Sequence, residues 1–217
     1  MDVAALLHRL FGDGTCSVPE LLADLQAPWD IVKRCPEVLA ALARRDVQGD
    51  VHPSAVIDGD VVVEPGAVVG PCAYILGPTI VRSGAVVRHG AYIRGSCLLE
   101  PESIVGHTTE VKNAVFLTHA CAPHFAYVGD SVLGAHSNLG AGVKLANVRV
   151  VAGNVAVRID GVRHDTGLRK LGALIGNNVK IGCNAVTNPG TILEADCVVY
   201  AGLCVSGHHA AGEVIKA

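Results

Sequence analysis

Residues 61–93 read VVVEPGAVVGPCAYILGPTIVRSGAVVRHGAYI, and a branched aliphatic side chain returns at every sixth position. Four residues after each aliphatic comes a small or β-branched residue, while glycine and proline fill many of the positions between them. Neither the 3.6-residue period of a helix nor the 2-residue period of a strand produces this spacing. The aliphatic series extends beyond this stretch at Val51, Ile57, Val63, Val69, Ile75, Val81, Val87, Ile93, Leu99, Val105, Val111 and Leu117.

A six-residue repeat with one large aliphatic and one small residue is typical of a left-handed parallel β-helix. Each repeat forms one flat side, three repeats form one coil, and the aliphatic side chain points into a triangular prism. Residues about 18 apart then stack in neighbouring coils at about 4.8 Å. We therefore predict an all-β repeat protein, and the aromatic content of only 4% fits so narrow a core.

The repeat also sets the domain organisation. Residues 1–48 contain three runs with helical apolar spacing, VAALLHRLF, SVPELLADL and PWDIVKRCPEVLAALARR, and are expected to form an N-terminal helical segment. Residues 49–210 are expected to form the β-helix, and residues 211–217 a tail. An interruption at about 151–174 alternates around Asp160-Gly161, which predicts a hairpin arm that projects from the prism.

The repeat loses its phase at CAPHFAYVGDS, residues 121–131. It is expected to resume, after a slip of four residues, as Tyr127, Leu133, Leu139 and Leu145. A slip of this kind suggests an inserted loop. Such a loop would hold His124 clear of the flat face, where a substrate can reach it.

Charge, hydropathy and cysteine content exclude several classes of function and location. A net charge of −3 gives no support to nucleic-acid binding. The N-terminus MDVAALLHRLF lacks the features of a signal peptide, and no apolar run is long enough to span a membrane. None of the eight cysteines forms a CxxC motif, and Cys97, Cys121 and Cys197 fall in the small-residue position. We expect reduced, buried thiols and a cytoplasmic protein.

Four motifs carry a resemblance to a known family: EVKNA, PHFAYVGDS, NLGAGVKLAN and DTGLRKLGALIG. With them, residues 106–205 resemble the acetyltransferase domain of the bifunctional enzymes that make UDP-N-acetylglucosamine. They are more similar still to archaeal-type sugar-1-phosphate nucleotidylyltransferase/acetyltransferases, and APWDI resembles the linker before the β-helix of those enzymes. Residues 1–50 hold no glycine-rich nucleotide loop, so we expect the acetyltransferase part without a nucleotidyltransferase domain.

The resemblance implies transfer of an acetyl group from acetyl-CoA to an amino-sugar 1-phosphate, in nucleotide-sugar biosynthesis. Glucosamine-1-phosphate and galactosamine-1-phosphate both remain open as acceptors. His124 occupies the position of the family's catalytic base, and an imidazole with an ordinary pKa of about 6.5 suits that role. The resemblance further implies a homotrimer with each site between two subunits, and no metal ion is expected.

Other substrate-binding positions carry over from the family one by one. Arg94 and Lys112 match two cations that bind the sugar phosphate, and their separation of 18 residues stacks them in neighbouring coils, where they can share one phosphate. Tyr127, Asn138 and Asn147 match a tyrosine and two asparagines that contact the sugar.

The coenzyme positions match less completely. Cys183 stands where the family usually has a serine near the coenzyme, and Ala201 matches an alanine there. Val148 replaces a tyrosine that often follows the asparagine, and the C-terminal tail with an arginine near coenzyme A is absent. Arg169 and Lys170 are therefore candidates for the coenzyme contact.

A γ-class carbonic anhydrase is an alternative, because that class has the same fold and binds zinc with three histidines. His119 and His124 have the H-x4-H spacing of two of those ligands. The third is expected at position 83, which is Ser83, while His89 lies on a different side of the coil from His119 and stacks with His107. Two ligands make a poor catalytic zinc site.

A trimeric scaffold without activity is a further alternative. Turnover with acetyl-CoA separates the acetyltransferase from both alternatives, and metal analysis separates the two alternatives from each other.

Overall fold

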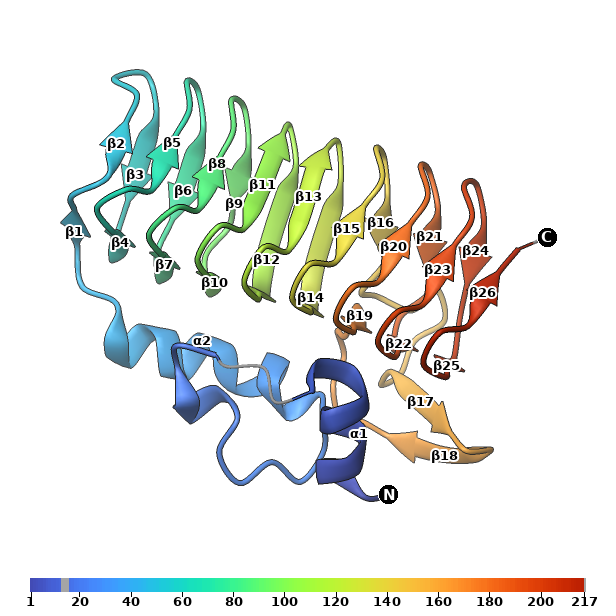
Figure 1. Ribbon diagram of the computed structural model, residues 1–217. Coiled ribbons are helices and arrows are strands. Elements are labelled where there is room, and N and C mark those ends of the chain that lie inside the picture. Colours follow the sequence, from blue (N-terminus) through green and yellow to red (C-terminus); the bar gives the residue numbers. More distant parts are fainter. Residues whose placement is uncertain (13–15, 217) are drawn as a thin grey trace.

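The computed structural model describes residues 1–12 and 16–216 and shows a parallel β-solenoid with helices along one side (Figure 1). In the described part of the chain, strands form a 15-stranded sheet, a 9-stranded sheet and a 2-stranded sheet. Every pairing in the two large sheets is parallel, and successive partners stack coil on coil. The predicted left-handed parallel β-helix is confirmed.

Three sides form each coil. The first side contains β1 (Asp46–Val47), β4 (Val61–Val63), β7 (Thr79–Val81), β10 (Cys97–Leu99), β19 (Ala173–Ile175), β22 (Thr191–Leu193) and β25 (His208–His209). The second side contains β2 (Asp50–Val51), β5 (Val68–Val69), β8 (Val86–Val87), β11 (Ile104–His107), β13 (Cys121–His124), β15 (Asn138–Leu139), β20 (Lys180–Ile181), β23 (Val198–Val199) and β26 (Val214–Ile215). The third side contains β3 (Val56–Asp58), β6 (Tyr74–Leu76), β9 (Tyr92–Ile93), β16 (Lys144–Leu145), β21 (Val186–Thr187) and β24 (Cys204–Val205).

Two longer strands join the third side to the first. β12 (Glu110–Phe116) pairs with β9 at its start and with β10 at its end, and β14 (Tyr127–Leu133) continues on β12. Each strand therefore turns a corner, and the pairing of β12 with β14 resumes after Asn113 and Asp130. The last strand, β26, still pairs with β23, so the coils continue past residue 210.

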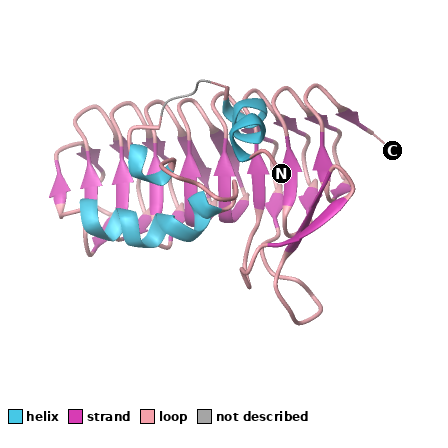
Figure 2. Cartoon of the chain, turned by 90° about the horizontal axis from the view of Figure 1, so that it is seen from below, coloured by secondary structure: helices cyan, strands magenta, loops and turns pink. Residues whose placement is uncertain are grey.

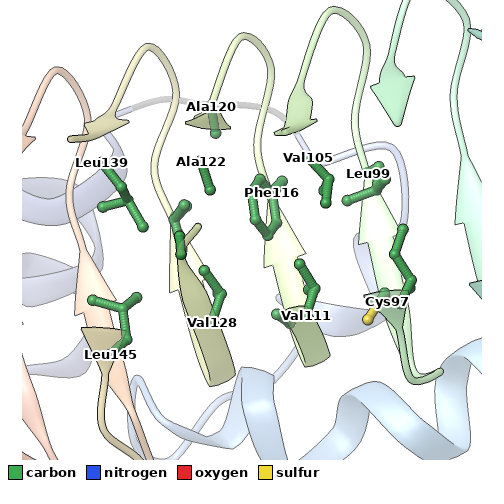
Figure 3. Packing of buried hydrophobic residues seen from close by; sticks show 14 of the residues in the cluster. Cys97, Leu99, Val105, Val111, Phe116, Ala120, Ala122, Val128, Leu139 and Leu145 are labelled. Carbon is green, nitrogen blue, oxygen red and sulfur yellow. The ribbon is translucent and has the colours of Figure 1, made fainter. Parts of the chain in front are cut away.

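The prism core consists of the inward aliphatic side chains that the repeat predicted, together with the small residues beside them. Figure 3 shows Leu99, Val105 and Val111 pointing into this core. Phe116 is the one phenylalanine among the core residues described, and it is fully buried. After the arm, the inward series again follows the prediction from Ile175 onward.

The phase shift differs from the expected one. Val111 is followed by the next inward side chain at Phe116, five residues later rather than six, and Val128 is followed in the same way by Leu133. Two coils are therefore one residue short, and Val111 pairs with Val128 at a separation of 17 residues. The shift of phase arises from two tight corners rather than from one insertion.

Because of this shift of phase, several side chains face a different direction from the one predicted. Leu117 and Tyr127 were expected to point inward, but Leu117 packs in a second core outside the prism and Tyr127 is half-buried. Ala120, rather than Cys121, occupies the small-residue position. The prediction of an inserted loop around His124 is also wrong, because this residue ends β13, which pairs with β11 as far as His107 and His124.

The N-terminal segment covers the outer face of the first side (Figure 2). It contains α1 (Val3–Phe11), the 3-10 turn η1 (Pro19–Leu21) and α2 (Asp30–Leu42). The run SVPELLADL was expected to be helical but forms only η1, and Asp24 has a φ of 48°, which a right-handed helix excludes. Beneath the helices lie the outward side chains Ile80, Leu98, Val115, Val132, Leu174 and Ile192.

A buried carboxylate holds α1 against the last coils. Glu194 is 2% exposed and accepts hydrogen bonds from Arg9 Nε at 2.6 Å and, through the same oxygen, from His208 Nε2 at 2.8 Å. Burial alone would raise the pKa of Glu194, but the hydrogen bonds from Arg9 and His208 outweigh it and lower the pKa. The backbone adds to this contact, because the Ala195 amide donates to the Arg9 carbonyl.

The predicted hairpin is confirmed. β17 (Ala156–Ile159) and β18 (Val162–Asp165) pair antiparallel around Asp160-Gly161, whose φ angles of 50° and 78° suit a two-residue turn. Residues 148–172, which leave the prism and return to it, are called the arm below. Among the described helices, none is both long enough and apolar enough to cross a membrane.

Candidate active site

The corner between the second and third sides carries one exposed or half-exposed residue per coil, and His124 is one of them. The carbonyl of each member from Pro71 to Cys183 accepts a hydrogen bond from the amide of a residue in the next coil. Gly142, for example, donates to His124 at 3.0 Å, and Phe125 donates to His107 at 2.9 Å. Together, the members of this column are Pro71, His89, His107, His124, Ala141, Cys183 and, by the register of β20 with β23, Ala201.

His124 is exposed at the end of β13, with His107 as its Cα partner on β11. Because it sits at a corner, its ring projects between two flat faces rather than from the middle of one. An exposed imidazole in this place can reach a substrate that lies along either face. The geometry therefore allows His124 to take part in proton transfer. The side chain is accessible because it lies at a corner, and not because it lies on an inserted loop as the sequence suggested.

Two further histidines share the column of His124, and the sequence analysis did not identify this relation. The rings of His89 and His107 stack at 4.0 Å, as the sequence predicted, and Phe125 packs edge-on against His107 at 4.9 Å. A regular coil of 18 residues does not bring His107 beside His124 in the predicted fold, because these two residues are 17 apart. The short coil could have been found only by noticing the one-residue loss of phase.

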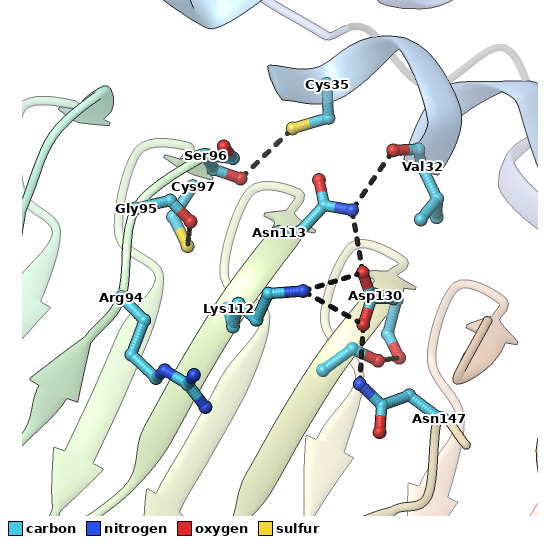
Figure 4. A network of polar contacts seen from close by, with 12 residues as sticks. Val32, Cys35, Arg94, Gly95, Ser96, Cys97, Lys112, Asn113, Asp130 and Asn147 are labelled. Atoms are coloured by element: carbon cyan, nitrogen blue, oxygen red, sulfur yellow. Dashed lines mark hydrogen bonds and ion pairs between the residues drawn. The ribbon is translucent and has the colours of Figure 1, made fainter. Parts of the chain in front are cut away.

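The next corner, between the third and first sides, carries the two predicted cations. Arg94 and Lys112 follow paired residues of β9 and β12 and therefore stack in neighbouring coils. Arg94 Nη1 lies 2.7 Å from Glu110 Oε1. Lys112 Nζ lies 3.3 Å from Asp130 Oδ1, as Figure 4 shows. The hydrogen bond to Glu110 raises the pKa of Arg94. Each cation thus has its own carboxylate partner.

Asp130 is the centre of a buried polar network. The residue is 3% exposed, and its carboxylate accepts hydrogen bonds from Lys112, from Asn113 Nδ2 at 2.9 Å and from Asn147 Nδ2 (Figure 4). Asn113 also donates to the Val32 carbonyl of α2 at 3.3 Å. The network therefore fixes Lys112 and Asn147 relative to each other and connects them to the helical segment.

The five predicted sugar-site residues do not all lie together. Tyr127 and Asn147 are neighbours, since a hydrogen bond from Asn147 partly offsets the effect of burial, which raises the pKa of Tyr127. Lys112 joins them through the shared carboxylate. Asn138 lies on the second side, paired with Cys121 and Lys180, so the corner of His124 separates it from the other residues.

The predicted coenzyme residues fall in two places. Cys183 and Ala201 are exposed and belong to the column of His124, in later coils. Arg169 and Lys170 are exposed at the end of the arm, where Lys170 forms an antiparallel bridge with Val148. The structure therefore brings Cys183 and Ala201 into line with His124 and places the two cations at the other corner.

The histidine pair proposed as zinc ligands does not converge within one chain. His119 stacks on His136 at 4.7 Å, at the corner between the first and second sides, whereas His124 lies at the opposite end of the second side. Within residues 1–12 and 16–216, no three His, Cys, Asp or Glu side chains are grouped so that they could hold a metal ion.

Comparison with known proteins identifies relatives over most of the chain. Residues 75–165 match the family described as the GMPPB C-terminal domain. A bifunctional protein GlmU from Methanococcus maripaludis is 43% identical over 208 residues, which cover 92% of this chain and 50% of the relative. A bifunctional sugar-1-phosphate nucleotidylyltransferase/acetyltransferase from Sulfurisphaera tokodaii is 35% identical over 193 residues, covering 89% of this chain and 48% of the relative. The chain thus spans about half the length of these curated relatives.

Proposed function

Because the chain is homologous to the C-terminal portion of GlmU-like bifunctional nucleotidylyltransferase/acetyltransferases, we propose that it is an acetyl-CoA-dependent N-acetyltransferase acting on an amino-sugar 1-phosphate. The observation that carries this proposal is the position of His124. It is exposed at a corner, in one column with Cys183 and Ala201, and one flat side away from Lys112.

The reaction requires one proton acceptor. The neutral amine of the sugar attacks the thioester carbonyl carbon, a C–N bond forms, and the C–S bond breaks as the coenzyme thiolate leaves. His124 accepts the proton that the nitrogen loses, because it is the exposed imidazole at this corner and a positioned histidine is the commonest general base. Backbone N–H groups at the glycine-rich corners are the donors available for the tetrahedral oxyanion.

The phosphate of the acceptor is assigned to Arg94 and Lys112. Both partners of the Arg94–Glu110 pair are about 40% exposed, at 40% and 38%, and such a pair contributes about 0–1 kcal/mol, so a phosphate can displace Glu110 at little cost. Lys112 differs, because its partner Asp130 is buried and held by two asparagines. In this proposal Lys112 is the fixed half of the clamp, and Arg94 moves onto the phosphate.

Replacing Arg94 with alanine is expected to raise KM for the sugar 1-phosphate by roughly 10-fold, which corresponds to about 1.4 kcal/mol, because one charge-assisted contact is lost. KM for acetyl-CoA should stay within about twofold. The measurement is an acetylation panel with glucosamine-1-phosphate, galactosamine-1-phosphate, glucosamine and UDP-glucosamine. Free glucosamine is the matched control, since it has no phosphate to lose. Equal wild-type rates with the free and the phosphorylated sugar would rule out the clamp.

A homotrimer is the proposed assembly. The helices cover the first side, so contact between copies falls to the second and third sides, which meet at the column of His124. Exposed apolar side chains on these two sides are Val56, Val68, Tyr74, Tyr92 and Val214. Burying such side chains favours association. In a trimer, Asn138 of one copy could complete the site around His124 of another copy.

Light scattering at micromolar concentration is expected to give three times the mass of one chain, which is 22.4 kDa. A charged residue in the middle of the apolar surface, as in Tyr92→Glu, should shift the population toward monomers, whereas Leu42→Glu on the helical segment should not. A wild-type chain that remains monomeric would contradict the assembly.

A further inference from the structure

The arm is cationic although the protein as a whole is acidic. Residues 148–172 contain five arginines or lysines and two aspartates, a net charge of +3, whereas the whole chain has a net charge of −3. Such a local excess of positive charge attracts anions. Whether these cations form a binding site depends on how firmly the arm is held and on what lies in front of its charged side chains.

The back of the arm is anchored. Val155, Val157 and Ile159 are buried in the core that the arm shares with the N-terminal helices, and His164 packs against Trp29 with ring centroids 6.3 Å apart. Gly190, with a φ of 80°, lets the arm approach closely, because a Cβ there would lie 2.8 Å from Val155 Cγ1. The arm is therefore a rigid support for its front face rather than a free loop.

The front of the arm brings like charges together. Arg158 and Arg163 are direct partners across the hairpin, so their side chains lie on the same face. Like charges directly opposite each other in an antiparallel pair are destabilising. Arg158 donates to the Gly161 carbonyl at 3.0 Å. Asp165 is the acidic neighbour of Arg163 and Arg149, and its pKa is lowered by a hydrogen bond from the Gly167 amide, by Asn154 and by these two arginines. A bound anion would remove the repulsion and use the guanidinium groups that face it.

A cavity of about 450 Å³ lies between the arm and the corner of the third side, a volume in the range of small-molecule sites. Arg149, Arg163 and Asn188 supply polar groups to its lining, and Val150 and Val151 supply exposed apolar surface. Cations beside an apolar wall fit a ligand that combines phosphate groups with a ring system. A bare inorganic anion would leave the valines without a partner.

The position of the cavity along the solenoid indicates which phosphate-containing ligand it could hold. Asn188 is in the same coil as Cys183, five residues along the third side, which corresponds to about 16 Å at 3.3 Å per residue. The proposed sugar-phosphate residues Arg94 and Lys112 belong to earlier coils. The cavity therefore lies level with the expected coenzyme residue Cys183 and also adjoins the expected sugar residue Asn147, whose chain neighbours Ala146 and Val148 line it.

We propose that this cavity binds the adenosine 3′-phosphate 5′-diphosphate end of coenzyme A. Arg149 and Arg163 contact the phosphates, Val150 and Val151 pack against the adenine ring, and the pantetheine chain crosses the third side toward the corner of His124. The identity of the ligand rests on the proposed acetyl-CoA-dependent function.

Isothermal titration of the full chain with coenzyme A tests this site. Arg163→Gln is expected to raise Kd for coenzyme A by about 10-fold, and Arg149→Gln should have a similar effect. The wild type should also bind 3′-dephospho-coenzyme A more weakly than coenzyme A. Arg45→Gln, which removes the same charge beside the first coils, should leave Kd unchanged. KM for the truncated donor S-acetyl-pantetheine should be the same in Arg163→Gln and in the wild type.

Two results would overturn the site while leaving the proposed function intact. One is wild-type affinity for coenzyme A in both arm variants. The other is a 10-fold loss of UDP-glucosamine binding in Arg163→Gln with unchanged binding of coenzyme A, which would assign the cavity to a nucleotide acceptor. If the wild type bound no coenzyme A at all, the proposed acetyltransferase function would fail together with the site.

Discussion

Replacement of His124 by alanine is expected to lower kcat for acetyl transfer by about 10²–10⁴-fold, the usual contribution of a positioned general base. The side chain is exposed at the corner where the second and third sides meet, so its removal leaves the prism core untouched. Coenzyme A affinity and the oligomeric state should therefore match those of the wild type. The measurement is thiol release from acetyl-CoA in the presence of glucosamine-1-phosphate.

His89 provides a matched control, because it belongs to the same column and is also exposed. It lies two coils before His124, away from the expected coenzyme residues. His89→Ala should change kcat by less than about twofold, an effect far below that expected of a general base. Equal turnover in His124→Ala and the wild type would show that another group accepts the proton.

Phe116→Ala is expected to lower the free energy of unfolding by about 3–5 kcal/mol, the usual range for a buried phenylalanine. The ring is fully buried in the prism, and its neighbours in the adjacent coils are Leu99 and Leu133. Those leucines belong to hydrogen-bonded strands and cannot close the cavity that the ring leaves. Urea denaturation followed by far-ultraviolet circular dichroism measures the loss.

Phe125 is the control for this prediction, because it is 55% exposed and lies outside the prism. Phe125→Ala should change the free energy of unfolding by no more than about 0.5 kcal/mol. Phe116→Leu keeps most of the volume and should cost less than about 1.5 kcal/mol. Similar losses in Phe116→Ala and Phe125→Ala would mean that the inward position of Phe116 is wrong.

The sequence predicted the large inward residues as far as Val111, again at Leu133, Leu139 and Leu145, and from Ile175 onward, because each flat side turns a large aliphatic side chain toward the prism. It misplaced the series at Phe116 and Leu117 for a physical reason. One of these side chains faces the prism and the other faces the helical segment, so both are buried and both are apolar. Where both faces of a strand are covered, polarity no longer distinguishes inside from outside.

The sequence predicted part of the candidate site and missed the rest, as it did for the inward series. Spacing placed Arg94 and Lys112 in neighbouring coils, since regular coils convert separation in sequence into position. It missed the carboxylate of Asp130, because nothing in the repeat reveals that an acid at a corner is buried and bonded to two asparagines. It also separated His107 from His124, because the coil between them is one residue short. The roles of these residues remain predictions.

The contact between α1 and the last coils bears on how the chain is made. Contacts between coils join residues 16–18 apart, or 42 apart where the arm intervenes, and can form while the ribosome is still at work, whereas Arg9 and Glu194 are 185 residues apart. At about 5–20 residues per second, α1 must wait roughly 10–40 s for its binding site to emerge. Until then the side chains of Leu6 and Leu10, buried in the finished protein, cannot reach that site. A nascent chain that stops early would therefore present an unshielded amphipathic helix to chaperones and proteases, however many coils had already stacked.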